Sequence, residues 1–326
     1  MRVLVTGGTG FLGSHLVETL LEKKAEVACL VRSTSNLRWI EGLPVERVPG
    51  SLEDPESLRR AVAGVEVVIH AAGVTKAISS VSYDRFNHQG TRNLLDACVR
   101  NGSSLKRFVY VSSLAAAGPS STRVPRKEID PPAPVSLYGL SKLRGEEAAL
   151  SYGSLFPVTV VRPPALFGPR DSDLFELIKM IGGGIFATFG KGERLIDLCY
   201  VTDAVRGILL AAEQPNAVGQ VFFIGSGQSY SWEMVAHLVA AQLGTTLKMI
   251  SLPASAASVY ALACDVRAYF TGRPFIISRH KLPELRQRYW ICDIGKAREI
   301  LNYRPATPLE QGLNLTVQWY RNQGWI

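Results

Sequence analysis

The sequence predicts an α/β fold built on a parallel, doubly wound sheet. Short apolar runs alternate with helical patterns through the first half of the chain, from residues 2–6 to residues 158–161. This alternation is typical of parallel strands joined by helices that cover both faces of a sheet. Small or polar residues follow several of the runs, and ligands of such folds bind at the carboxyl ends of the strands. We therefore expect a ligand site at that edge of the sheet.

The turn between the first strand and the first helix predicts a dinucleotide site. It carries three evenly spaced glycines, and a helical pattern with Leu16 and Leu20 follows. Glycine permits a tight turn and lets backbone N–H groups approach a pyrophosphate at a helix N-terminus, which a purely structural turn does not require. The residues expected to contact the cofactor here are Gly7, Gly10, Phe11, Leu12 and Gly13.

The residue after the second strand bears on the choice of cofactor. Residues 26–31 form that strand, and Arg32 follows the glycine turn at the distance, about 20 residues, where NAD enzymes usually place an acid for the ribose hydroxyls. A guanidinium suits a 2′-phosphate instead. NADP(H) is therefore favoured and NAD(H) is the alternative. The plain structural interpretation of Arg32 is a solvated surface arginine.

Two further strands are expected at residues 45–48 and 65–69. The second leads to His70, which we interpret as a packed, hydrogen-bonded histidine because no second metal-ligating residue stands near it; no metal site is predicted. The small residues that follow His70 and leave room for a cofactor are Ala71, Ala72 and Gly73.

A helix and a strand then introduce two polar candidates. The helix is expected over residues 83–100, with Asn101-Gly102 as its end, and it carries Asn87. The strand over residues 107–112 leads directly to Ser113. A proline-rich loop follows and delivers the chain to the next helix.

That helix carries a phenol and an ammonium four residues apart, at Tyr138 and Lys142, so one helix face presents both. A phenol with a pKa near ~10 is a poor acid or base at neutral pH, but a neighbouring cation stabilises the phenolate. Found alone, the pattern is that of an ordinary amphipathic helix. The expected strand ends at Ala72, Ser113 and Pro164 fall on the same edge of the sheet, and this convergence favours a proton-transfer site.

In the second half of the chain the predicted strands and helices alternate less regularly. A strand near 195–200, a helix over 202–212 and a strand at 221–224 are expected, and helices over 293–301 and 308–322 close the chain. We assign residues 1–165 to a dinucleotide-binding domain, to which strands from about 195–225 also contribute, and residues 166–326 mainly to substrate binding.

An apolar segment at residues 252–264 is interrupted by Asp265 and Arg267, well short of the ~20 residues that a membrane span needs. Several basic residues follow it. Three interpretations are open for this segment: a lid over an apolar substrate, a plain substrate-domain helix, or a helix that lies on a membrane surface. The last interpretation makes residues 252–290 a candidate for peripheral membrane contact.

The charge and cysteine content limit the remaining classes. The net charge of +8 is compatible with nucleic acid, an acidic membrane or an anionic cofactor, but no basic stripe interleaved with aromatic residues is present, so nucleic-acid binding is not expected. The five cysteines are scattered and form no C-x-x-C pair, which indicates a reducing compartment. Met1 leads directly into a strand, and a cytoplasmic location is expected.

With the glycine motif, Asn87, Ser113 and Tyr138-x-x-x-Lys142 in order, the sequence resembles the extended short-chain dehydrogenase/reductases of the NAD-dependent epimerase/dehydratase superfamily over essentially its full length. The resemblance implies a Rossmann-type fold. It also implies that the tyrosine is the general acid/base, that the lysine lowers the tyrosine's pKa and holds the nicotinamide ribose, that the serine hydrogen-bonds the substrate oxygen, and that the asparagine has a structural or relay role. A homodimer through the helices at 83–100 and 138–151 is implied as well.

The departures from the family pattern concern the substrate. Nucleotide-sugar epimerases of this family carry an asparagine and an arginine where this chain has Ala165 and Ile196, so a diphosphate would be poorly held. Arg194 stands two places away on the same strand face, at a different height. The Arg162-Pro163-Pro164 form, the apolar segment at 252–264 and the run at 289–298 resemble the 3β-hydroxysteroid dehydrogenase and dihydroflavonol reductase branches. Ser51 and Leu52 are expected on the adenine side of the cofactor, and Ser51 departs from the aspartate that is common in the family.

The sequence therefore predicts an NAD(P)-dependent oxidoreductase that interconverts a hydroxyl and a ketone on a hydrophobic, steroid-, flavonoid- or lipid-like substrate. The spacing to Tyr138 favours Ser113 over its neighbour Ser112 for the serine role. The alternatives are a nucleotide-sugar epimerase or dehydratase that holds NAD tightly, and a non-catalytic dinucleotide-binding sensor.

Overall fold

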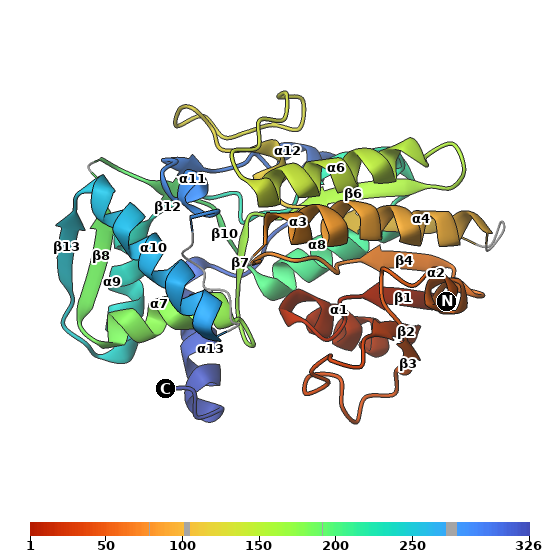
Figure 1. Cartoon of the computed structure of the whole chain (residues 1–326), viewed down its shortest axis with the longest axis horizontal. Helices are drawn as coiled ribbons and strands as arrows, with labels where there is room; N and C mark the ends of the chain where they lie inside the picture. Colours follow the sequence, from red (N-terminus) through yellow and green to blue (C-terminus); the bar gives the residue numbers. More distant parts are fainter. Residues whose placement is uncertain (78, 101–104, 191, 272–278) are drawn as a thin grey trace.

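The central element of the structure is a seven-stranded sheet in the order β11-β6-β5-β4-β1-β2-β3, in which all neighbours are parallel. The computed structural model describes residues 1–77, 79–100, 105–190, 192–271 and 279–326. Figure 1 shows the sheet on the right. Its strands are β1 (Arg2–Thr6), β2 (Glu26–Val31), β3 (Glu46–Pro49), β4 (Val67–His70), β5 (Arg107–Val111), β6 (Val158–Arg162) and β11 (Val221–Phe223). The predicted Rossmann-type, doubly wound α/β fold is confirmed.

Helices cover both faces of this sheet, because strand side chains alternate between its two sides. Val3 and Val5 of β1 pack with α1 and α8, whereas Leu4 packs with α2, α4 and α6. The strands therefore read as nearly continuous apolar runs. The helical segments of this part are α1 (Phe11–Glu22), α2 (Pro55–Val62), α3 (Ser80–Asp84), the π-helical turn η1 (Arg85–Gln89), α4 (Gly90–Arg100), α5 (Leu114–Ala117), α6 (Leu137–Ser151), α8 (Val201–Glu213) and the short 3₁₀ turn η2 (Pro215–Ala217).

The second part of the molecule, on the left of Figure 1, is built on three small sheets with their own apolar core. β7 (Ala165–Phe167) pairs with β10 (Leu198–Tyr200), β12 (Tyr230–Ser231) and β14 (Tyr289–Trp290) flank β9 (Leu195–Ile196), and β8 (Ile185–Phe189) pairs with β13 (Lys248–Leu252). Its helices are α7 (Ser172–Gly182), α9 (Trp232–Leu243), α10 (Ala254–Thr271), α11 (Leu282–Leu285) and α13 (Leu309–Asn322), whereas α12 (Gly295–Ile300) packs against β11 of the large sheet. Of the strands expected from about 195–225, β11 joins the large sheet, whereas β9 and β10 pair outside it.

One expected helix differs from the sequence prediction. The helix expected over 83–100 begins at Ser80 and contains the π-helical turn η1, and its expected end at Asn101-Gly102 lies outside the described residues. The apolar segment at 252–264 lies mostly on α10, which extends through Asp265 to Thr271. The carboxylate of Asp265 accepts a hydrogen bond from Arg279 Nε at 2.8 Å.

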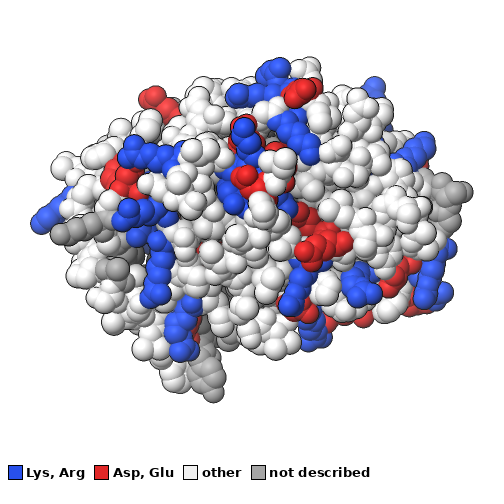
Figure 2. All heavy atoms as spheres, turned by 90° about the horizontal axis from the view of Figure 1, so that it is seen from above, with Lys and Arg blue, Asp and Glu red and all other residues white. Residues whose placement is uncertain are grey.

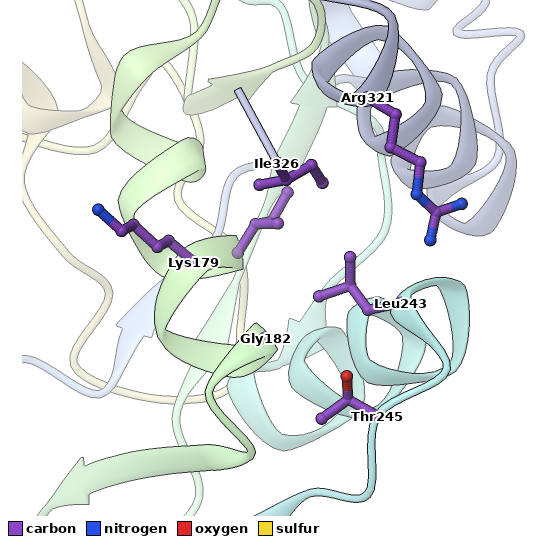
Figure 3. A pocket seen from close by; sticks show the side chains of 7 residues that line it. Lys179, Gly182, Leu243, Thr245, Arg321 and Ile326 are labelled. Atoms are coloured by element: carbon purple, nitrogen blue, oxygen red, sulfur yellow. The ribbon is translucent and has the colours of Figure 1, made fainter. Parts of the chain in front are cut away.

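Within the described residues, no helix is long and apolar enough to cross a membrane. Figure 3 shows a hollow lined by residues of α7, α9 and α13, among them Lys179, Leu243 and Arg321. These residues belong to the part of the chain assigned mainly to substrate binding, but none of them is among the individual site residues predicted from the sequence.

Candidate active site

The glycine turn after β1 is shaped by close backbone contacts. Gly7 has φ +75°, a conformation that other residues rarely adopt, and its Cα faces the backbone of Ala72 at the end of β4. A Cβ on Gly13 would lie 2.0 Å from the Gly7 carbonyl oxygen. The Gly10 N–H donates to that same oxygen at 3.0 Å. Glycine is therefore required at the first and third positions of the motif.

This turn delivers the chain to the N-terminus of α1, which fits an anionic group. Within the described part of the chain, no side chain caps α1 at Gly10, and its first turn carries no acidic residue. The first N–H groups of a helix lack intrahelical partners and attract negative charge. The backbone from Gly10 to Gly13 would hold the pyrophosphate of a dinucleotide, as the sequence predicts.

The end of β4 is organised around His70. Its Nδ1 lies 2.6 Å from Thr6 Oγ1 and its Nε2 lies 3.0 Å from Thr91 Oγ1. Burial lowers the pKa of His70 to about 3, so the ring is neutral. The N–H groups of Ala71 and Ala72 donate to Thr6, which holds this strand end against the glycine turn. His70 is thus a packed, hydrogen-bonded histidine.

The remaining residues predicted for the cofactor lie around the same edge of the sheet. Arg32 is exposed directly after β2, and its backbone N–H donates to Ser35 Oγ at 3.0 Å. Ser51 Oγ accepts a local hydrogen bond from the Glu53 N–H, and Leu52 is buried against Gly90. Pro164 is buried just after β6.

Ser113 and Tyr138 come from different elements, and Ser113 lies close enough to the phenol to act on its pKa. Ser113 caps α5, where its Oγ accepts from the Ala115 N–H at 3.1 Å. Tyr138 lies in the first turn of α6. Burial raises the pKa of Tyr138 to about 12, and the Ser113 side chain opposes this rise because its hydroxyl favours the phenolate. The phenol is a proton donor at neutral pH in this state.

Lys142 lies one turn further along α6 and is almost completely buried. Its Nζ donates to the Val111 carbonyl at 2.7 Å and stands 4.4 Å from the ring centroid of Tyr110. Burial lowers the pKa of Lys142 to about 7, although the Glu146 carboxylate acts in the opposite direction. The Cα of Gly73 faces this ammonium. The structure thus brings the predicted lysine to the same strand ends as the small residues after β4.

Asn87 connects the end of β4 to α6 from the π-helical turn η1. Its Oδ1 accepts from the Val74 N–H at 2.7 Å, and its Nδ2 donates to the Val74 carbonyl and to Ser141 Oγ. The turn is closed by a hydrogen bond from the Gly90 N–H to the Arg85 carbonyl, which is the wider spacing of a π-helix. Asn87 therefore fixes the position of α6 relative to the cofactor edge.

Ser112 serves a different network from its neighbour Ser113. Its Oγ donates to Glu146 Oε2 at 2.7 Å, and the same carboxylate accepts from Arg162 Nε at 2.9 Å. All three side chains are buried. A buried ion pair needs such additional hydrogen bonds to offset its desolvation. The structure places Ser113, and not Ser112, beside Tyr138.

Three side chains around Tyr138 were not anticipated as part of the site. Lys281 Nζ stands 4.6 Å from the Tyr138 ring centroid and pairs with Glu284 Oε2 at 2.8 Å. The Ser136 hydroxyl donates to the same Glu284 carboxylate, which raises the Tyr138 pKa further. The ring of Tyr83 lies 6.3 Å from that of Tyr138. Only the basic run that includes Lys281 signalled this part of the site in the sequence.

The arrangement can hold a dinucleotide at the glycine turn and move a proton at Tyr138. Comparison with known proteins identifies the family. Residues 3–225 match the model of the NAD dependent epimerase/dehydratase family. This chain belongs to that family. It is an NAD-dependent enzyme of the extended short-chain dehydrogenase/reductase type, and the predicted resemblance is confirmed.

Relatives within and around this family carry out more than one reaction. The chain is 29% identical over 325 residues to a ceramide reductase of Caulobacter vibrioides, with 99% of this chain and 96% of the relative covered. It is 29% identical to a 4-hydroxy-2-methyl-3-oxo-4-farnesyl-3,4-dihydroquinoline-1-oxide ketoreductase of Stigmatella aurantiaca, with 96% and 95% covered. A structure of the UDP-glucose 4-epimerase of Thermotoga maritima with UDP-glucose superposes with a TM-score of 0.80 at 27% identity, over 99% of each chain.

The two positions predicted to depart from the nucleotide-sugar enzymes lie in different surroundings. Ile196 is buried in the apolar core of the second part, paired with Tyr230 across β12. Ala165 is exposed at the start of β7. The guanidinium of Arg194 donates to the Leu285 carbonyl, and burial lowers its pKa with the neighbouring Arg288 acting in the same direction. Arg194 is thus connected to α11, the short helix beside Tyr138.

Proposed function

We propose that this chain uses NADP(H) to interconvert a hydroxyl and a ketone on a hydrophobic, ring-bearing or lipid-like substrate, with Ser113, Tyr138 and Lys142 as the reacting site. The observation that carries the proposal is that Ser113 lies beside the Tyr138 phenol and lowers its pKa, with the buried Lys142 one helical turn away on α6. Two hydroxyls that meet at the end of β5 offer one substrate oxygen both a proton and a hydrogen bond.

A dinucleotide held at the glycine turn from Gly7 to Gly13 would supply the hydride chemistry. In reduction, Tyr138 would donate its hydroxyl proton to the carbonyl oxygen as the carbonyl carbon is reduced. In oxidation the phenolate takes the proton back. Ser113 Oγ holds the substrate oxygen in place. Lys142 is the cation whose charge favours the phenolate, and its low pKa places its own titration near neutral pH. The proton and the hydride together account for the two electrons and two hydrogens of the alcohol.

The hydrophobic substrate is supported by what replaces the polar positions of the nucleotide-sugar enzymes. Ile196 is apolar and belongs to the core, and Ala165 carries no hydrogen-bonding group. The names of the ceramide reductase and the farnesyl-dihydroquinoline ketoreductase refer to lipid-like substrates. A pocket for such a substrate needs few polar groups beyond those at the reacting carbon.

The preference for NADP(H) is supported by Arg32, an exposed arginine directly after β2. A guanidinium can pair with a 2′-phosphate in a bidentate manner, whereas the acid usual in NAD enzymes would repel it. We also propose that the enzyme is a homodimer and that it does not bind nucleic acid.

A second candidate, a nucleotide-sugar epimerase, is favoured by the structural likeness to the UDP-glucose 4-epimerase. Such an enzyme returns the hydride to its own product and needs no added cofactor. Cofactor consumption therefore separates the two functions.

The test uses the full chain and a panel of long-chain ketones, steroid ketones and UDP-sugars, with NADPH oxidation as the readout. We expect NADPH consumption with an apolar ketone. We expect Tyr138→Phe to lower turnover by roughly 10³-fold with little change in cofactor binding, because the ring is kept and the proton is lost. Tyr152→Phe is the matched control and should leave turnover intact, since Tyr152 lies at the other end of α6 and its hydroxyl donates to Asp96. Conversion of a UDP-sugar without added cofactor would favour the epimerase, and full turnover in Tyr138→Phe would remove the acid/base role.

A further inference from the structure

Helix α10 carries an exposed apolar stripe. At ~100° per residue its members fall within roughly 80° of the helix circumference, so they form one face. They are Val259 (70% exposed), Leu262 (48%), Val266 (50%) and Phe270 (80%). Ala257 and Ala261, on the opposite side of the helix, are buried. Large apolar side chains gathered in this way on a surface mark a contact with something other than water.

Basic side chains border the stripe on both sides. On one side, Arg279 pairs with Asp265 of α10 at 2.8 Å, and the guanidinium of Arg286 donates to Ser258 at 3.2 Å. On the other side the helical spacing places Arg267, which is exposed. Figure 2 shows Lys and Arg side chains, with fewer acidic ones, on the left of the molecule, where Figure 1 places β8, β13 and α10.

This pattern fits an anionic lipid bilayer better than a second copy of the chain. Two copies joined through this face would bring the arginines of one stripe against those of the other, and like charges repel. An anionic lipid surface instead accepts the apolar stripe at the boundary of the acyl chains and attracts the flanking cations. The net charge of +8 acts in the same direction.

Helix α10 packs against α11, the short helix beside Tyr138. Ala257 and Ala261 of α10 form an apolar cluster with Leu282 of α11. The residue before Leu282 is Lys281, whose ammonium lies over the ring of Tyr138. The apolar stripe thus lies on one side of α10, and the other side of α10 is linked to Tyr138 through Leu282 and Lys281.

We propose that α10 is an interfacial helix that docks this enzyme on an anionic lipid bilayer, with its apolar stripe in the headgroup region and the Tyr138 site beside the membrane surface. This inference goes beyond the proposed function, because docking requires neither turnover nor bound cofactor. It is a surface contact, since no helix among the described residues is long and apolar enough to cross a membrane.

The experiment is flotation of the full chain with vesicles of phosphatidylcholine alone or with roughly a third phosphatidylglycerol. We expect the protein to float with the anionic vesicles and much less with the neutral ones. The double variant Leu262→Asp with Phe270→Asp should lower the partition coefficient more than tenfold, because it places charge in the apolar face. Thermal unfolding is measured alongside for the double variant and for Leu262→Asp alone, which should also lower flotation with unchanged unfolding because Leu262 is 48% exposed.

Two further variants make the result specific. Ile129→Asp is the matched control, since Ile129 is 88% exposed in a loop distant in sequence from α10, and it should float like the wild type. Arg279→Gln with Arg286→Gln should weaken flotation with anionic vesicles only. The proposal is overturned if the wild type does not float, or if the Ile129 variant loses as much flotation as the double variant. It is also overturned if the Leu262 and Phe270 substitutions change the sedimentation mass, which would assign the stripe to contact with a second copy.

Discussion

The ammonium of Lys281 lies over the face of Tyr138, 4.6 Å from the ring centroid, although the two residues are far apart in the sequence. Lys281 is paired at 2.8 Å with Glu284, and this carboxylate raises the pKa of Tyr138. Two opposite charges from one short segment therefore act on the same phenol. A cation over a ring face favours the phenolate, whereas a nearby carboxylate disfavours it.

We predict that neutralising each charge shifts the pH profile of alcohol oxidation in opposite directions. Oxidation needs the phenolate, so kcat/KM rises with pH up to the pKa of Tyr138. Glu284→Gln should move this limb to lower pH and Lys281→Met to higher pH, each by roughly half to one pH unit. Gln keeps an acceptor for the Ser136 hydroxyl. Shifts in the same direction would show that the variants act through a structural change.

The adjacent serines are predicted to separate activity from stability. Ser113→Ala should lower turnover about 100-fold, because it removes a hydrogen bond to the reacting oxygen. Ser112→Ala should instead lower the free energy of unfolding by about 1.5–3 kcal/mol, because the buried Glu146 carboxylate loses a donor. Steady-state kinetics and urea unfolding of both variants test this. The reverse assignment would follow if Ser112→Ala lost turnover while keeping wild-type stability.

The buried lysine gives a pH-dependent stability with a defined sign. In the folded, cofactor-free protein the pKa of Lys142 is lowered to about 7 from 10.5. Below pH 7 the Lys142 amine is protonated in both the folded and the unfolded state, so the cost of burying its charge lowers the stability in full. Between pH 7 and 10.5 the unfolded chain binds more protons than the folded one, so the free energy of unfolding rises with pH. Relative to Lys142→Met, the wild type should gain on the order of a few kcal/mol across this window.

Urea unfolding at several pH values between 7 and 10 measures this difference. Lys248→Met is the control, because Lys248 is exposed and should give no trend relative to the wild type. Subtracting each variant from the wild type removes the titration of the other groups. A flat difference for Lys142→Met would mean that this amine is not buried as a charge.

The cofactor preference is predicted to depend on Arg32. Arg32→Asp should shift the ratio of kcat/KM for NADPH over NADH towards NADH by one to two orders of magnitude, because a carboxylate repels the 2′-phosphate and accepts from the ribose hydroxyls. Arg59→Asp is the matched control on α2, where Arg59 is exposed and pairs with Glu56. An unchanged ratio in the Arg32 variant would assign this arginine to the solvated surface.

The proposed homodimer makes a further prediction. If two copies join through α4 and α6, sedimentation should give twice the mass of the chain, and Ala148→Arg on α6 should lower it towards the monomer because the new side chain cannot be accommodated. Leu315→Arg is the control: Leu315 is 42% exposed on α13, outside the expected interface. A monomeric wild type would refute the prediction directly.

Sequence reasoning worked best where the structural cause is local. The requirement for glycine at Gly7 and Gly13 arises from a positive φ and a backbone contact within one turn. The shared face of Tyr138 and Lys142 follows from helix periodicity. The positions of Ala72 and Ser113 at one sheet edge follow from the alternation of strands and helices, which fixes where the strands end.

Other features depend on contacts that the sequence does not encode locally. Lys281 and Glu284 reach Tyr138 only because α11 packs beside α6, so in the sequence Lys281 appeared as part of a basic run. The pairing of Asp265 with Arg279 joins α10 to a later segment, and no pattern within either segment indicates it. The pairing of Ser112 with Glu146 and Arg162 is likewise set by tertiary packing.

The π-helical turn η1 also determines which deletions the helix from Ser80 to Arg100 can tolerate. A π-turn holds one residue more than the α-helical turn it replaces, and each residue of a helix advances the side chains by ~100°. Deleting one residue between Arg85 and Gly90 would restore a regular helix but rotate the upstream half, with Tyr83, out of phase with the downstream half, where Thr91 holds His70. The chain therefore tolerates substitution at the exposed Gln89 far better than its removal, and the length of this helix is as fixed as the identity of Asn87.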